Sequence, residues 1–251
     1  MRMSRRGMIA TAMLQCVSWI SRANAWAAPL DPTLRRFVLS VGELGLAVRS
    51  GSLAPAAWQD SMAEIYADLP PEELIRFIDM DRLLRDVRPP EARIGAIANV
   101  PWPEVDGFPV GFRFGHKLFV DWEGACTPPH VHNHLVSAHF VLEGRIRART
   151  YDRLTDLDSS IRLRPTRDEE LGPGRLVTMS DERDNGHWFD GLTQRSISFD
   201  IPISGIAPDK AYRHPAEGHN QIFIDPTVDG NLDGTIDAPI IEFEESLRKF
   251  A

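Results

Sequence analysis

The segment GACTPPHVHNHLVSAHFVLEG, from Gly124 to Gly144, decides the fold. His130 and His132 stand two residues apart among residues that favour strand, so both imidazoles project from the same face. Imidazole nitrogens bind metal ions at about 2.0–2.1 Å, and such a pair supplies two neighbouring ligands. Residues 138–144 alternate like a half-buried strand that ends at a glycine turn. The segment therefore predicts a strand, a short turn and a returning strand that together hold a metal ion.

The spacing of this segment resembles the first signature motif of the cupin superfamily. Gly124, His130, His132 and Gly144 match that motif position by position. The family usually has a glutamate ligand where this chain has Ser137, and a serine hydroxyl is a poor ligand for first-row transition metals. The resemblance implies a cupin-type double-stranded β-barrel (jelly roll) whose metal site departs from the family pattern at one ligand.

A later segment is similar to the second cupin motif, which supplies one more histidine near the end of a hairpin. It begins at Gly174 and reaches His187, which follows the turn dipeptide Asn185-Gly186 and precedes Trp188-Phe189. The resemblance makes His187 the expected third ligand, while the aromatic residues beside it are equally consistent with a core strand. The two motifs together cover residues 111–203, the middle of the chain.

Two further residues are weaker candidates for the site. His139 has the same strand parity as Ser137, so it can point inward and stand in for the missing glutamate. Tyr151 lies on the strand after Gly144 and is a weak catalytic candidate that would orient bound oxygen or substrate. A core aromatic is the favoured interpretation of Tyr151.

Other charged and polar residues near the motifs are expected to lie outside the site. Three arginines alternate along one strand and share a face: Arg145, Arg147 and Arg149. Such a face can clamp a carboxylate, but it is more often solvated and paired with acids. His134 is expected in the turn, and three histidines without a motif are read as surface residues: His116, His214 and His219.

A site formed by His130, His132 and His187 would be neutral and would leave coordination positions open. Iron(II), manganese, nickel, copper and zinc all fit, since affinity order alone does not select among them. Cupin dioxygenases that act on small thiols have a three-histidine iron site without the glutamate, and this pattern is similar to theirs. The resemblance implies an iron(II)-dependent dioxygenase that brings a small-molecule substrate and oxygen into contact. The alternative is a non-catalytic periplasmic small-molecule-binding cupin with a structural metal or none.

The order of patterns along the chain predicts helices first and strands after. Apolar residues recur at three- and four-residue intervals before a stop at Ser50-Gly51, and prolines begin two further helices, 55–66 and 70–84. From Val100 onward, short alternating runs indicate strands. We therefore expect a mainly β chain with an N-terminal helical block (28–98), a cupin β-barrel (99–206) and a C-terminal extension (207–251). The helical block would cover one mouth of the barrel or form the surface of a homodimer.

Composition places the chain among soluble globular proteins and bounds its partners. Of its 251 residues, 43% are hydrophobic and 25% are charged, and the formal net charge is -8. An acidic balance without a Lys/Arg-rich run beyond the N-terminus argues against nucleic acid as a partner. No stretch reaches the ~18 apolar residues that a membrane span needs. A small molecule is the expected partner.

Residues 1–27 resemble a bacterial export signal. Ser4-Arg5-Arg6 resembles the start of a twin-arginine signal, and the small residues of Ala23-Asn-Ala25-Trp-Ala27-Ala28 offer an Ala-x-Ala cleavage site after a moderately apolar run. The residues after the arginines complete the twin-arginine pattern poorly, so the ordinary secretory route stays open, as does an attached amphipathic helix. Export would make the protein periplasmic or secreted. Cleavage would leave Cys126 as the one cysteine, so no internal disulfide is expected.

The C-terminal extension contains a second candidate metal site. Residues 229–237 match the first nine positions of a calcium loop of the EF-hand or dockerin kind. The oxygen ligands would come from positions one, three, five and nine: Asp229, Asn231, Asp233 and Asp237. Ile240 stands where the acid of position twelve is expected, and no helix precedes the loop. A polar turn is the favoured interpretation, with calcium as the alternative.

Overall fold

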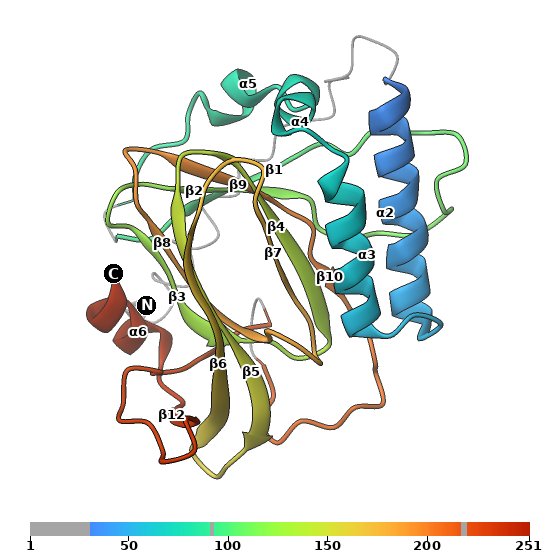
Figure 1. Ribbon diagram of the computed structural model, residues 1–251. Helices are drawn as coiled ribbons and strands as arrows, with labels where there is room; N and C mark the ends of the chain where they lie inside the picture. The colour runs from blue at the N-terminus through green and yellow to red at the C-terminus, as the bar shows by residue number, and fades with distance from the viewer. Residues whose placement is uncertain (1–30, 91–92, 217–219) are drawn as a thin grey trace, which may run out of the picture.

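The computed structural model describes residues 31–90, 93–216 and 220–251, in which two antiparallel sheets form the centre of the molecule (Figure 1). The expected export signal, residues 1–27, and His219 lie outside the described residues. Within the described ranges, none of the helices combines the length and apolar character that a membrane crossing requires. The chain is mainly β with helices in its N-terminal part, as the sequence predicts.

Four helices precede the sheets: α2 (Pro32–Ser50), α3 (Pro55–Ala67), α4 (Pro71–Phe77) and α5 (Met80–Leu84). The first ends at Gly51, whose φ of 76° is left-handed, which confirms the expected stop. The single helix expected over 70–84 is wrong, because the structure has two. Ile78 is extended there (φ -90°, ψ 113°), and the Asp79 side chain accepts a hydrogen bond from the Arg82 backbone N–H at 3.1 Å, which starts α5.

The first sheet has the strand order β1-β2-β9-β4-β10, with β7 also paired to β4. Its strands are β1 (Ala96–Asn99), β2 (Lys117–Asp121), β4 (Leu135–Glu143), β7 (Leu176–Met179), β9 (Ser196–Asp200) and β10 (Ile203–Ser204). One face of this sheet packs against the helices. Tyr66 of α3 stacks on Phe140 of β4 with ring centroids 4.6 Å apart, and Trp58 is fully buried beside them. Figure 1 shows α2 and α3 along the side of this sheet, so these two helices cover an outer face of the barrel.

The second sheet has the strand order β11-β3-β8-β5-β6-β12. Its strands are β3 (Cys126–Val131), β5 (Ile146–Asp156), β6 (Ser160–Leu171), β8 (Gly186–Gly191), β11 (Ile222–Phe223) and β12 (Ile236–Pro239). Both edge strands, β11 and β12, come from the C-terminal extension, and the final helix α6 (Phe243–Phe250) contacts β3. The extension is thus built into the sheet that carries the histidines.

Candidate metal site

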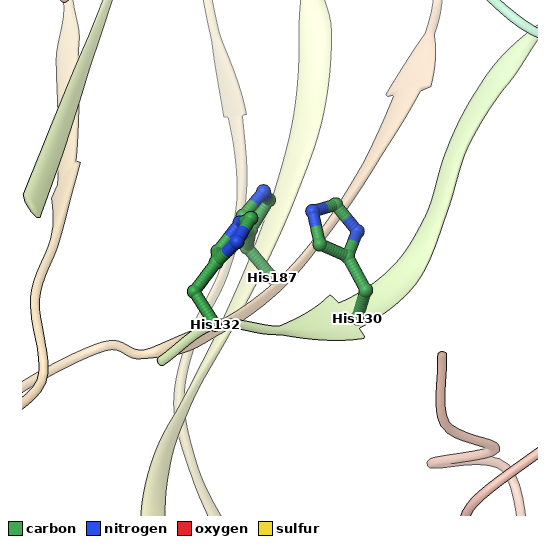
Figure 2. Close-up of side chains that lie close together, drawn as sticks. All are labelled: His130, His132 and His187. Atoms are coloured by element: carbon green, nitrogen blue, oxygen red, sulfur yellow. The ribbon is translucent and has the colours of Figure 1, made fainter. Parts of the chain in front are cut away.

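The structure brings together the three histidines of the two motifs (Figure 2). One ligand nitrogen from each of His130, His132 and His187 lies within 4.8 Å of the others. Among the described residues, no other group of histidine, cysteine or acidic side chains meets this criterion. All three side chains are buried, so the group lies inside the barrel rather than on its surface.

Strand pairing places these rings. His130 lies on β3 and is the register partner of His187 on β8, and His132 follows directly after the end of β3. The ring centroid of His130 lies 4.2 Å from that of His187 and 4.7 Å from that of His132. Alternation along the strand therefore puts His130 and His132 on one face, and the register partner His187 lies on the same face of the neighbouring strand.

Hydrogen bonds at Nδ1 make Nε2 the atom through which two of the rings would bind a metal. His130 Nδ1 donates to the Pro128 carbonyl at 2.7 Å, and His132 Nδ1 donates to the Asn220 carbonyl. A histidine that donates from Nδ1 presents the lone pair of Nε2, and such contacts fix the orientation of metal-binding rings. His187 Nδ1 is buried and has no hydrogen-bond partner within the described residues. These donors fit a divalent transition metal, which prefers imidazole nitrogen.

The three rings are neutral at pH 7. Burial lowers the pKa of His130 to about 4. Burial also lowers the pKa of His132 and His187 well below the ordinary value, and repulsion from neighbouring histidines lowers them further. Metal binding requires unprotonated imidazole, so the site needs no deprotonation at neutral pH.

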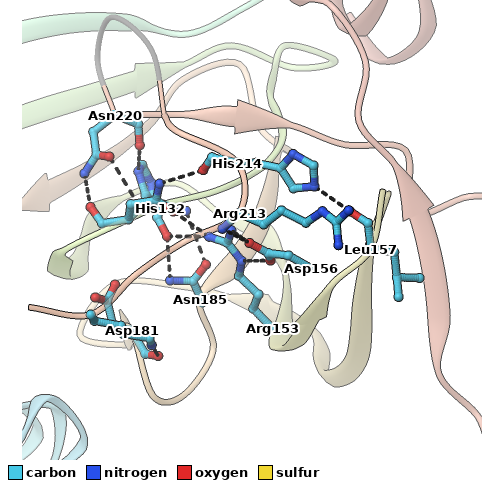
Figure 3. A network of polar contacts seen from close by, with 11 residues as sticks. His132, Arg153, Asp156, Leu157, Asp181, Asn185, Arg213, His214 and Asn220 are labelled. Atoms are coloured by element: carbon cyan, nitrogen blue, oxygen red, sulfur yellow. Dashed lines mark hydrogen bonds and ion pairs between the residues drawn. The ribbon is translucent and has the colours of Figure 1, made fainter. Parts of the chain in front are cut away.

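A polar network holds the backbone of His132 in place (Figure 3). The Asn185 side chain accepts from the His132 N–H at 3.2 Å and donates to its carbonyl at 3.1 Å. Arg153 also donates to this carbonyl at 3.0 Å, while Asp156 accepts two hydrogen bonds of 2.8 Å from the guanidinium. Asn185 precedes Gly186 and His187, so one amide links two of the histidine-bearing segments. The sequence showed Asn185 only as a turn residue and gave no signal for Arg153.

The residue at the position of the family's glutamate, Ser137, is bonded to a neighbouring carboxylate and is not one of the three grouped ligands. The Ser137 hydroxyl donates to Asp200, and His139 Nε2 lies 3.4 Å from the same carboxylate. The His139 ring faces the interior, as its parity predicts, and its centroid is 6.1 Å from that of His187. His139 is nevertheless outside the three-histidine group, because it contacts Asp200 and Ser198 instead.

Tyr151 lies on the opposite face of its strand from the site. It pairs with Gly186, whereas its neighbour Thr150 pairs with His187. The Tyr151 ring packs in an apolar cluster with Val131 and other buried residues. This packing agrees with the interpretation of Tyr151 as a core aromatic.

The arginine face is paired with acids. The pairs are Arg145–Glu170 at 3.1 Å, Arg147–Asp168 at 2.6 Å and Arg149–Asp190 at 2.7 Å. The pairing with acids is as expected, and Arg145 and Arg147 are solvated. Arg149 is largely covered and stacks on the Trp188 ring.

The remaining histidines are spread over the molecule. His116 is not the surface residue expected, because it is partly buried. Its ring centroid lies 5.5 Å from that of Trp102 and 5.5 Å from that of Phe114. His134 lies in the turn before β4, with a φ of 55°. His214 Nε2 donates to the Leu157 carbonyl at 2.7 Å.

The candidate calcium loop forms a polar turn. Asp233 accepts hydrogen bonds from the Thr235 N–H at 3.1 Å and from its hydroxyl at 2.7 Å. Asp237 accepts two hydrogen bonds from Arg162, at 2.7 and 2.9 Å. The three acids of the loop form no group like that of the histidines within the described residues. These hydrogen bonds agree with the interpretation as a polar turn.

Comparisons with known proteins find only distant structural likenesses. No protein-family model matches the sequence, and no functionally curated protein matches it. A protein of Thermus thermophilus is 16% identical with a TM-score of 0.34, over 50% of this chain and 94% of its own. A cupin superfamily protein of Desulfitobacterium hafniense is 16% identical with a TM-score of 0.30, and the match covers 46% of this chain and 84% of that protein. An oxalate oxidase is 15% identical with a TM-score of 0.34, over 47% of this chain and 55% of its own.

Two antiparallel sheets surround histidines that stand at the spacing of both cupin motifs. The chain has the cupin fold. In this chain the two glycines of the first motif have left-handed backbones, with a φ of 74° at Gly124 and 69° at Gly144. A Cβ atom at Gly144 would lie 2.2 Å from the Arg195 carbonyl oxygen, so the glycine is needed for close backbone approach as well. The motif glycines thus shape the two turns that flank the histidine strands.

Proposed function

We propose that this cupin is a mononuclear-metal oxidoreductase of the dioxygenase kind that acts on a small molecule. One observation carries the proposal, namely the convergence of three buried, neutral imidazoles. Transition metals take four to six ligands, so three histidines leave positions for substrate and oxygen. A divalent metal bound there, with iron(II) as the expected ion, would polarise and orient both reactants.

The surroundings of the site favour an anionic group on the substrate. Lys117 is the register partner of Asp200 and shares its side of β2 with Phe119, whose ring contacts His139. The Lys117 ammonium is close enough to lower the pKa of His132 and His139, in each case less than burial does. Lys117 has no ion-pair partner among the described residues, since Asp200 is held by Ser137 and His139. Its charge is therefore available to a carboxylate or similar group beside the metal.

The test is elemental analysis followed by oxygen uptake. Protein purified without chelator is compared with a His130→Ala/His132→Ala variant. We expect about one transition-metal ion per chain, lost in the variant, because one three-histidine group of this kind occurs in the described residues. Small chelating substrates, thiols and carboxylates among them, should then cause oxygen uptake in the loaded wild type alone. A bound metal without uptake for any substrate would point to a small-molecule-binding cupin with a structural metal.

Export is a separate part of the proposal and rests on residues 1–27 alone. The N-terminus of protein recovered from a bacterial periplasm should begin near Ala28. A chain that retains Met1 and stays in the cytoplasm would contradict it.

A further inference from the structure

A glutamine of the C-terminal extension touches the metal-facing atom of His130. Gln221 Nε2 lies 3.1 Å from His130 Nε2. His130 Nδ1 carries the ring proton, because it donates to the Pro128 carbonyl. The Nε2 atom is therefore an acceptor, and the Gln221 amide donates to it. The amide occupies the lone pair that a metal would use.

The separation of these two atoms matches that of neighbouring ligands on one metal ion. Ligand atoms at about 2.1 Å from a metal are about 3.0 Å apart at a right angle and about 3.4 Å apart in a tetrahedron. The Gln221 amide, at 3.1 Å from His130 Nε2, falls between these values. Rotation about the last side-chain torsion exchanges the amide nitrogen for its oxygen, and this torsion is soft. The oxygen would then face the ion.

Strand register explains why this side chain faces the site. On β11, Phe223 pairs with His130 and Ile222 pairs with Val131. Alternation therefore gives Gln221 the same face as His130. The residue before it, Asn220, accepts the hydrogen bond from His132 Nδ1. Two successive residues of the extension thus contact two different histidines of the group.

We infer that the side-chain amide oxygen of Gln221 is the fourth protein ligand of the metal. The inference rests on the proposed metal centre. Ser137 is bound to Asp200 and does not supply this ligand, so the group comes from a strand on the other side of His130. An amide oxygen is neutral, which leaves the full charge of the cation to an anionic substrate. The C-terminal extension is then part of the site.

The test measures cobalt(II) binding to the full chain after chelator treatment, with affinity from competition and geometry from the visible spectrum. Gln221→Ala should weaken binding by about 10–100-fold and change the spectrum, the range seen when partners of a metal site are removed. Gln221→Glu should restore tight binding, since a carboxylate oxygen takes the same place. Gln194→Ala, at an exposed turn between β8 and β9, is the matched control and should behave as wild type.

The cobalt experiments test the role of Gln221 and the metal centre itself separately. Cobalt binding by the wild type with the same affinity and spectrum in Gln221→Ala would overturn the role of Gln221 and leave the metal centre standing. Absence of cobalt binding by the folded wild type would overturn the centre itself, and the proposed function with it. Circular dichroism of the metal-free proteins checks folding. If Gln221→Ala does not fold, Gln221→Glu carries the test: exchange of a neutral ligand for an anionic one should raise the cobalt affinity, and an unchanged affinity and spectrum in that variant would overturn the inference.

Discussion

Gly144 shows how much one motif residue contributes to the barrel. Its φ of 69° is unfavourable for any residue with a Cβ atom, and that atom would lie 2.2 Å from the Arg195 carbonyl oxygen. We predict that Gly144→Ala lowers the free energy of unfolding by more than about 3 kcal/mol, because the strained backbone also has to move. Gly205→Ala is the control, since Gly205 has a φ of 76° and nothing within 4 Å of its Cβ position. The control should lose only about 1 kcal/mol in urea denaturation. Equal losses would show that the close approach is unimportant.

Asp121 makes stability depend on pH. Burial raises its pKa to about 7, with repulsion from Asp190 as the smaller cause. A folded-state pKa above the unfolded value of about 3.9 means that the folded state binds more protons between pH 4 and pH 7. Stability from this group is therefore present at low pH and is lost as the pH rises through 7. The loss builds up between the two pKa values and is complete above pH 7, where it amounts to about 4 kcal/mol at 1.36 kcal/mol per pKa unit.

Asp121→Asn should remove this loss, because the amide stays neutral at every pH. We predict a variant more stable than wild type at pH 8 and of similar stability at pH 4.5. Urea denaturation at several pH values measures the difference. Parallel pH profiles of the two proteins would exclude Asp121 as the cause.

At the scale of elements, α3 and β4 meet through one aromatic stack. Tyr66 is buried between Phe140 and Phe37, with ring centroids 4.6 and 5.2 Å away, and its hydroxyl has no hydrogen-bond partner within the described residues. We predict that Tyr66→Phe raises the free energy of unfolding by about 1 kcal/mol, because a buried unpaired hydroxyl is lost and the stack is kept. Tyr66→Ala should lower it by about 3–5 kcal/mol through the cavity left behind. Loss of stability in Tyr66→Phe would mean that the hydroxyl is paired.

Sequence spacing predicted the elements that depend on local rules. The histidine pair needs only strand alternation, and the end of α2 needs only a glycine that adopts a left-handed backbone at position 51. The break at Ile78 was missed because two prolines and a regular apolar pattern favour one continuous helix. The helices were expected as a block, but which face of the sheet they cover depends on residues such as Tyr66 meeting Phe140.

The parts of the site that the sequence did not predict come from distant pairing. Asn220 and Gln221 reach His132 and His130 across 88 and 91 residues of chain. No spacing within the C-terminal extension specifies that β11 will pair with β3. Within the extension the clearest local pattern was that of the candidate calcium loop, yet Asp233 accepts a hydrogen bond from Thr235 and Asp237 accepts one from Arg162.

At the scale of the whole molecule, the apolar packing is divided between two sides. One large cluster joins the helices to the first sheet, a smaller one joins the second sheet to the C-terminal extension, and a third lies between the two sheets. The metal site lies on the second side, where strand pairing and a small apolar cluster join β3, β8 and the C-terminal extension. A bound ion would add further links between these segments.

Metal binding should therefore stabilise the molecule unevenly. A ligand that binds only the folded state adds about 2.7 kcal/mol at a free concentration of 100 times its Kd. We predict that cobalt(II) or iron(II) slows hydrogen exchange most in β3, β8 and residues 220–224, because these segments supply or hold the ligands. The amides of α2 and α3 pack on the other sheet and should gain protection only through the rise in global stability. Mass spectrometry of exchanged peptides measures this pattern, and the His130→Ala/His132→Ala variant should show no change with metal. Uniform protection across both sides, or none in residues 220–224, would contradict a site completed by the C-terminal extension.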